Sequence, residues 1–184
     1  MSWIASIPKS EANGELAELY SRIASERSDV ANILAIQGVN PKVLARHFDL
    51  YVATVFGKSP LSRAEREIIA LVVSVANNCF YCKSHHAEAL HQLGFDKAML
   101  KAIKVSRKKA DLSPKLKAIC DFSEKLTLRP RSVVKADIDK LRAVGLDDRA
   151  IHDVVATTAY FNMANRIAMG LGVELEENFE QTCG

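Results

Sequence analysis

Residues 61–96 read LSRAEREIIALVVSVANNCFYCKSHHAEALHQLGFD, and this stretch indicates two consecutive helices with a sharp break between them. Ser62 followed by Glu65 forms a capping box, which marks the start of a helix. That helix continues through Ile68 to Ala76, where apolar residues occupy most of its sides, so we expect it to be buried. An Asn-Asn pair ends it, and the second helix follows at once.

Helical patterns recur along the rest of the chain, and the period-two alternation typical of strands is absent. Residues 11–25 and 41–57 read as two further helices. The sequence predicts an all-α fold of about eight helices. With 184 residues, of which 48% are hydrophobic, the chain is expected to form one domain over residues 1–184. Within it we expect an N-terminal helical extension at 1–40 and a core at 41–174.

The core contains an internal repeat of two copies. Each copy has a helix start, a Gly turn and an Asp that opens the next helix, at one constant offset: Leu61-Ser62, Gly94 and Asp96, and then Leu112-Ser113, Gly145 and Asp147. The site residues described next have no counterparts in the second copy, which is therefore expected to be scaffold.

The second helix of the opening stretch carries a pair of cysteines and a histidine. At 100° per residue, Cys79, Cys82 and His86 face one way within an arc of about 60°. A helix start favours a thiolate, and His86, one turn after Cys82, can accept the thiol proton. Glu67 on the preceding helix can orient that histidine, and the second thiol can trap the oxidised first one as a disulfide. The pattern predicts a dithiol redox site.

Other interpretations of these residues remain open. A CxxC pair also binds zinc, but the fourth ligand would then have to come from Glu67 or His85. His86 could fill a polar gap in the core, and Glu67 could be a surface charge. The combination at this spacing favours redox chemistry over zinc.

The remaining chemistry-bearing residues lack such neighbours. Cys120 is expected to be buried and Cys183 to be incidental near the C-terminus. Three histidines are expected to be ordinary helix-surface residues: His47, His91 and His152. Three polar residues lie on one side of the predicted helix that closes the core: Asn162, Asn165 and Arg166. The ordinary interpretation is that they belong to a packed helix face. The alternative is that they line an active-site cavity or form a subunit contact.

The charge distribution argues against binding to nucleic acid. The net charge is +3, and the basic clusters at 107–109 and 129–131 are short and flank loops. The N-terminus lacks the pattern of a signal peptide, and the longest apolar stretch, Ile68 to Ala76, is too short to cross a bilayer. We expect a cytoplasmic protein without membrane or nucleic-acid partners.

Glu67, Cys79-x-x-Cys82 and His86 at this spacing resemble the signature of the alkylhydroperoxidase D family, within the carboxymuconolactone decarboxylase superfamily. The resemblance spans residues 41–174, and the closing helix resembles the peroxidase-related branch. It implies an alkylhydroperoxidase D-like helical fold that works without a cofactor or metal and assembles as trimers or hexamers.

The resemblance also implies roles for the site residues. Cys82 would attack the peroxide, and Cys79 would be the more exposed, resolving thiol. His86 would be the base and Glu67 its partner. Electrons would come from a dithiol donor, a lipoyl-bearing or thioredoxin-like adaptor. The best-known peroxidases of the family carry a histidine where this chain has Tyr81, which makes Tyr81 and His85 auxiliary candidates.

The expected function is a thiol-dependent peroxidase that reduces hydroperoxides. One alternative is a dithiol redox sensor or disulfide reductase without fast peroxide turnover. Another is decarboxylase-like chemistry, although the decarboxylases of the superfamily lack the cysteine pair. We also expect a homo-oligomer, because residues 68–76 and 151–171 are rich in apolar residues on several faces.

Overall fold

The computed structural model describes residues 2–27, 29–106, 110–177 and 179. These residues form nine α-helices and no strand, which confirms the all-α prediction. The short second helix was not expected from the sequence. The helices are α1 (Gly14–Arg27), α2 (Asn32–Ala35), α3 (Pro41–Tyr51), α4 (Arg63–Ala76), α5 (Phe80–Gln92), α6 (Lys97–Ser106), α7 (Pro114–Leu128), α8 (Lys135–Ala143) and α9 (Asp148–Gly170).

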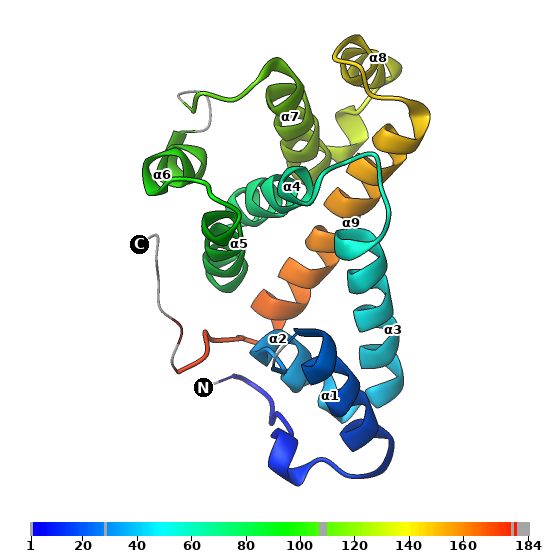
Figure 1. The fold of residues 1–184 in the computed structure, drawn as a ribbon, viewed down its shortest axis with the longest axis vertical. Helices are drawn as coiled ribbons and strands as arrows, with labels where there is room; N and C mark the ends of the chain where they lie inside the picture. The colour runs from blue at the N-terminus through cyan, green and yellow to red at the C-terminus, as the bar shows by residue number, and fades with distance from the viewer. Residues whose placement is uncertain (1, 28, 107–109, 178, 180–184) are drawn as a thin grey trace.

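Helix α4 is the centre of the molecule, and α5, α7 and α9 pack around it (Figure 1). It begins at the predicted capping box, in which the Ser62 hydroxyl accepts a hydrogen bond from the backbone N–H of Glu65. Its residues from Ile68 to Val73 are buried. The apolar faces of α4 are therefore covered within one chain and give no support for an oligomer. Exposed apolar side chains lie elsewhere, on and before α3, at Val39, Val43 and Leu50.

The two halves of the core repeat each other, as the sequence predicted. Helices α4, α5 and α6 correspond in order to α7, α8 and α9. Gly94 and Gly145 both have positive φ angles, +91° and +89°, which a residue without a Cβ adopts at little cost. Asp96 and Asp147 both accept hydrogen bonds from backbone N–H groups three residues further on.

The N-terminal and C-terminal segments meet at the lower end of α9 (Figure 1). Helices α1 and α2 pack on α3 through a cluster that includes Leu19, Ile23 and Phe48. The chain after α9 turns back to α2, where the carbonyl of Glu174 accepts a hydrogen bond of 3.1 Å from the side chain of Asn32. These contacts enclose a cavity between the N-terminal helices, α5 and α9.

Other predictions from the sequence concern Cys120, membrane-spanning helices, and the residues near the C-terminus and at 107–109. Cys120 is fully buried, as predicted. None of the helices that the structure describes is long and apolar enough to cross a membrane. The basic cluster at 107–109 and Cys183 lie outside the described residues.

Candidate functional site

The turn between α4 and α5 positions the two cysteines. Asn78 has a φ of +55°, a conformation that Asn tolerates better than most residues, and its side chain accepts a hydrogen bond from Lys83. The turn places Cys79 immediately before α5, at the N-cap, and Cys82 in the first turn. The predicted helix start is confirmed, one residue later than the sequence suggested.

The two cysteine sulfurs are free thiols whose Sγ atoms lie 2.6 Å apart. A disulfide needs about 2.05 Å, so a small side-chain movement would join them. Both residues are buried, with 1% of Cys79 and 5% of Cys82 exposed. The expectation that Cys79 is the more exposed thiol is wrong, because the residues around the start of α5 cover its side chain and only Cys82 lines the cavity.

The two thiols differ in acidity. The hydrogen bond with Cys82 is the main influence that lowers the pKa of Cys79, and the backbone N–H of Cys82 and the charge of Lys83 add to it. The same hydrogen bond, together with burial, raises the pKa of the Cys82 thiol, which an Asn165 hydrogen bond lowers only in part. Cys79 is therefore the more acidic thiol of the pair, and Cys82 holds its proton more strongly.

Glu67 lies behind His86 in the core. Only 2% of it is exposed, and its Oε2 lies 2.7 Å from Nδ1 of His86. Its Oε1 accepts hydrogen bonds from the guanidinium of Arg63, one of them 3.1 Å long. Burial, the largest influence, raises the pKa of Glu67, but His86 and Arg63 together outweigh it and hold the pKa below its ordinary value. The surface-charge interpretation of Glu67 is therefore wrong.

The ionised Glu67 fixes the tautomer of His86. A carboxylate only accepts hydrogen bonds, so the hydrogen lies on Nδ1 and Nε2 is the ring atom that can take a proton. The ring of Phe161 meets that of His86 edge-on, with the centroids 4.5 Å apart, and holds its orientation. His86 lines the same cavity as Cys82, so the structure brings together the residues that the sequence grouped.

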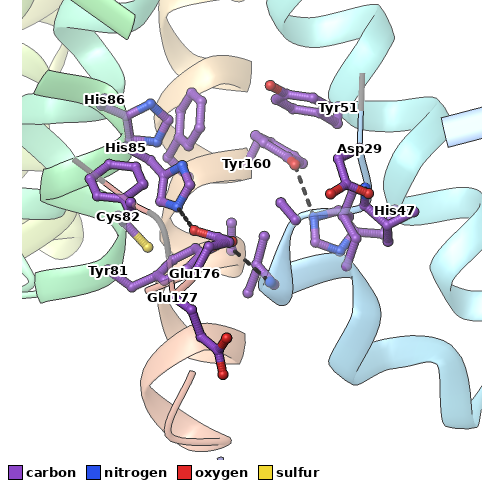
Figure 2. A pocket seen from close by; sticks show the side chains of 17 residues that line it. Asp29, His47, Tyr51, Tyr81, Cys82, His85, His86, Tyr160, Glu176 and Glu177 are labelled. Carbon is purple, nitrogen blue, oxygen red and sulfur yellow. Dashed lines mark hydrogen bonds and ion pairs between the residues drawn. The ribbon is translucent and has the colours of Figure 1, made fainter. Parts of the chain in front are cut away.

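The auxiliary candidates Tyr81 and His85 both contact the segment that follows α9. The Tyr81 hydroxyl donates a 2.9 Å hydrogen bond to Glu176, whose other oxygen lies 2.8 Å from Nε2 of His85 (Figure 2). The backbone N–H of Asn32 also donates to Glu176. Burial raises the pKa of Glu176, but the hydrogen bonds from His85 and Asn32 prevail and lower it to about 2.

The cavity has a volume of about 510 Å³ and aromatic walls (Figure 2). Cys82 and His86 lie on the α5 side, and His47 and Tyr51 on the α3 side. Tyr160 of α9 lies between them. Volumes of this size are typical of sites for small organic ligands.

His47 is the residue that the sequence analysis placed wrongly. It is 5% exposed and hydrogen-bonded through both ring nitrogens, at 2.9 Å each, to Gln37 and Tyr160. Burial lowers its pKa to about 4. The signal was present, because His47 shares one helix face with Leu44, Phe48 and Tyr51, at spacings of three and four residues. His152, in contrast, is exposed as expected.

The three polar residues of the closing helix lie outside the cavity. Asn165 is fully buried and donates a hydrogen bond to Ser74. Asn162 accepts hydrogen bonds from Asn77 and from the exposed Arg166. Asn162 and Asn165 tie α9 to the end of α4, as expected for a packed face, whereas Arg166 is exposed and contacts only Asn162.

The geometry of the candidate ligands does not support a zinc site. Glu67 faces His86 and Arg63, and His85 faces Glu176, so neither side chain is directed to the cysteines. In the described part of the chain, no three His, Cys, Asp or Glu side chains are grouped so as to hold a metal ion.

Comparison with known proteins relates this chain to one family. The sequence profile of the carboxymuconolactone decarboxylase family matches residues 41–125. An uncharacterized peroxidase-related protein from Silicibacter sp. TM1040 has the same fold, with a TM-score of 0.86 and 29% identity over 97% of this chain and 93% of that one. The family match and this shared fold support a place in the alkylhydroperoxidase D/carboxymuconolactone decarboxylase superfamily.

Two further proteins are similar to this chain. A second uncharacterized peroxidase-related protein, an alkylhydroperoxidase AhpD core from Ralstonia eutropha JMP134, has a TM-score of 0.88 and 25% identity, covering 97% of this chain and 94% of that one. The uncharacterized protein YdfG of Bacillus subtilis (strain 168) is 26% identical over 115 residues, which are 62% of this chain and 78% of YdfG. The alkylhydroperoxidase D-like fold expected from the sequence is confirmed.

Proposed function

We propose that the protein is a thiol-dependent peroxidase that reduces hydroperoxides with the dithiol of Cys79 and Cys82. The observation that carries this proposal is the pair of free thiols, 2.6 Å apart, at a cavity that also holds His86. Similarity to two peroxidase-related proteins supports it. The cysteine pair also argues against decarboxylase chemistry.

The first chemical step is attack of Cys82 on the hydroperoxide. His86 takes one proton from the dithiol through Nε2, and within the resulting monoanion the remaining proton moves from Cys82 to Cys79. The Cys82 thiolate then attacks the terminal peroxide oxygen. The O–O bond breaks, Cys82 becomes a sulfenic acid, and the proton on His86 passes to the departing alkoxide to give an alcohol.

The second step closes the disulfide and the third reopens it. The Cys79 thiol attacks the sulfenic sulfur and releases water, which prevents further oxidation of Cys82. An external dithiol then reduces the disulfide. Because both sulfurs are buried, a slender lipoyl-type dithiol can enter the cavity more readily than the surface thiols of a thioredoxin-like protein.

The test is steady-state loss of a hydroperoxide with dihydrolipoamide as the electron donor. The proposal requires many turnovers per protein, and it requires reduced thioredoxin to be the poorer donor. Consumption of a single equivalent of peroxide, followed by arrest with either donor, would instead identify a dithiol redox sensor or a disulfide reductase. Cys120→Ser is the matched control, because Cys120 is a buried cysteine of the core cluster outside the site.

A further inference from the structure

A chain of three buried polar side chains reaches the cavity from the wall opposite Cys82, and Figure 2 shows two of them, His47 and Tyr160. Oε1 of Gln37 lies 2.9 Å from Nδ1 of His47, and Nε2 of His47 lies 2.9 Å from the Tyr160 hydroxyl. The exposed fractions are 8% for Gln37, 5% for His47 and 6% for Tyr160. The peroxidase chemistry proposed above uses none of them.

The hydrogen bonds fix the direction of every proton in this chain. The amide nitrogen of Gln37 donates to the carbonyl of Ile33, at 2.6 Å, so the amide oxygen faces His47. That oxygen only accepts, which puts the hydrogen of the neutral His47 on Nδ1 and leaves Nε2 as an acceptor. The Tyr160 hydroxyl must therefore donate its hydrogen to His47.

The Tyr160 oxygen can accept a further hydrogen bond from the cavity, since its own hydrogen is already committed. Tyr160 thus presents an acceptor to whatever binds there. Tyr81, the phenol on the α5 side, is different, because its hydroxyl donates to Glu176 and accepts from the backbone N–H of Ile33.

The rest of the wall suits an organic body. Apolar and aromatic side chains line the space around Tyr160, among them Ile33, Leu34, Phe161 and Ala164. The cavity, at about 510 Å³, greatly exceeds the roughly 30 Å³ that a water molecule occupies in the liquid, so a small peroxide such as hydrogen peroxide would fill little of it.

We infer that Tyr160, held by His47 and Gln37, is a specificity-determining residue that accepts a hydrogen bond from an O–H group of an apolar organic ligand in this cavity. The inference rests on the proposed function for the identity of that ligand, an organic hydroperoxide and the alcohol formed from it. Both carry the required O–H group, so the alcohol reports on the subsite without any redox step.

The test is calorimetric binding of cumyl alcohol and of tert-butylbenzene, which has a similar apolar body without the hydroxyl. In Tyr160→Phe, the ratio of the alcohol affinity to the hydrocarbon affinity should fall by roughly 3- to 10-fold, as expected for one neutral hydrogen bond. The matched control is Tyr20→Phe, which removes a buried hydroxyl bonded to the carbonyls of Ile7 and Ala35, away from the cavity. That variant should keep the ratio of the wild type.

A second variant tests the proton direction. His47→Leu frees the Tyr160 hydroxyl hydrogen, so acetophenone, which only accepts hydrogen bonds, should gain affinity relative to cumyl alcohol by several fold. An unchanged alcohol-to-hydrocarbon ratio in folded Tyr160→Phe, or no binding of either ligand to the wild type, would overturn the inference. Failure of peroxide turnover with these binding ratios intact would refute the proposed chemistry and leave the subsite standing.

Discussion

Replacing Glu67 by Gln should slow peroxide reduction by roughly 10²- to 10⁴-fold. The reason lies in how the carboxylate is held. Arg63 donates to Oε1, and its guanidinium lies 3.9 Å from the centroid of the Phe56 ring, which fixes its position. In Glu67→Gln the amide oxygen should keep the Arg63 contact, so the amide NH₂ group must face Nδ1 of His86.

That change reverses the tautomer of His86. An amide NH₂ donates, so Nδ1 becomes an acceptor and the ring hydrogen moves to Nε2, the atom that must take the thiol proton. Folding should survive, because the new side chain fits the same space and keeps hydrogen bonds at both positions. We expect the free energy of unfolding to change by no more than about 2 kcal/mol.

The assay is stopped-flow measurement of hydroperoxide loss with dihydrolipoamide, together with thermal unfolding of each variant. Glu65→Gln is the matched control: Glu65 lies two residues earlier on α4 and pairs with Lys115, outside the site. It should keep the rate within about twofold, since Gln can still complete the capping box and only the ion pair with Lys115 is lost. A Glu67→Gln enzyme that is folded and as fast as the wild type would refute the reasoning.

Three further predictions concern the titration of His47, the contacts of Glu176 and the assembly of the chain. His47 has a pKa of about 4 when folded against 6.5 when unfolded, so between these pH values the unfolded chain binds more protons, and the protein loses stability as the pH falls. The free energy of unfolding, measured by urea titration, should fall by about 3 kcal/mol at pH 4 because of His47, and this loss should be absent from His47→Leu. If the free energies of unfolding of the wild type and of His47→Leu changed in parallel with pH, this prediction would be wrong. Glu176→Gln should loosen the segment after α9 and so raise the rate at which Ellman's reagent modifies Cys82 about tenfold, whereas Glu177→Gln should leave that rate unchanged. Equal modification rates in the two variants would show that Glu176 does not keep this segment over Cys82. The family resemblance implies that sedimentation at micromolar concentration should show a trimer or hexamer. Val43 and Leu50 are exposed apolar residues available for contacts, and a 20.3 kDa species alone would exclude an oligomer.

Much of the fold could be predicted because its signals are local. Helix starts and stops depend on residues three or four positions apart, such as Ser62 and Glu65, and the structure has them where the sequence put them. The repeat was visible for the same reason, since Gly94 and Gly145 make the same turn. The grouping of Glu67 with His86 needed only the packing of two consecutive helices.

What the sequence could not give depends on contacts between distant segments. Glu176 reaches Tyr81 across 95 residues, and nothing in the helical period of either segment indicates that contact. The burial of Cys79 has the same origin, because residues from η2 (Ile36–Val39) and the end of α9 pack on the start of α5. His47 is a different case, because its position on the apolar face of α3 was available in the sequence.

The most direct test of the dithiol mechanism is the product of a single anaerobic turnover. Reduced wild-type protein, given one equivalent of hydroperoxide, should lose two thiols and show an intact mass lower by two hydrogen atoms. Cys79→Ser should still consume the peroxide and gain one oxygen atom, mapped by peptide mass spectrometry to Cys82, and Cys82→Ser should leave the peroxide almost untouched. Wild-type protein that keeps both thiols while the peroxide remains would contradict the account, and so would a Cys82→Ser variant that reacts as fast as the wild type.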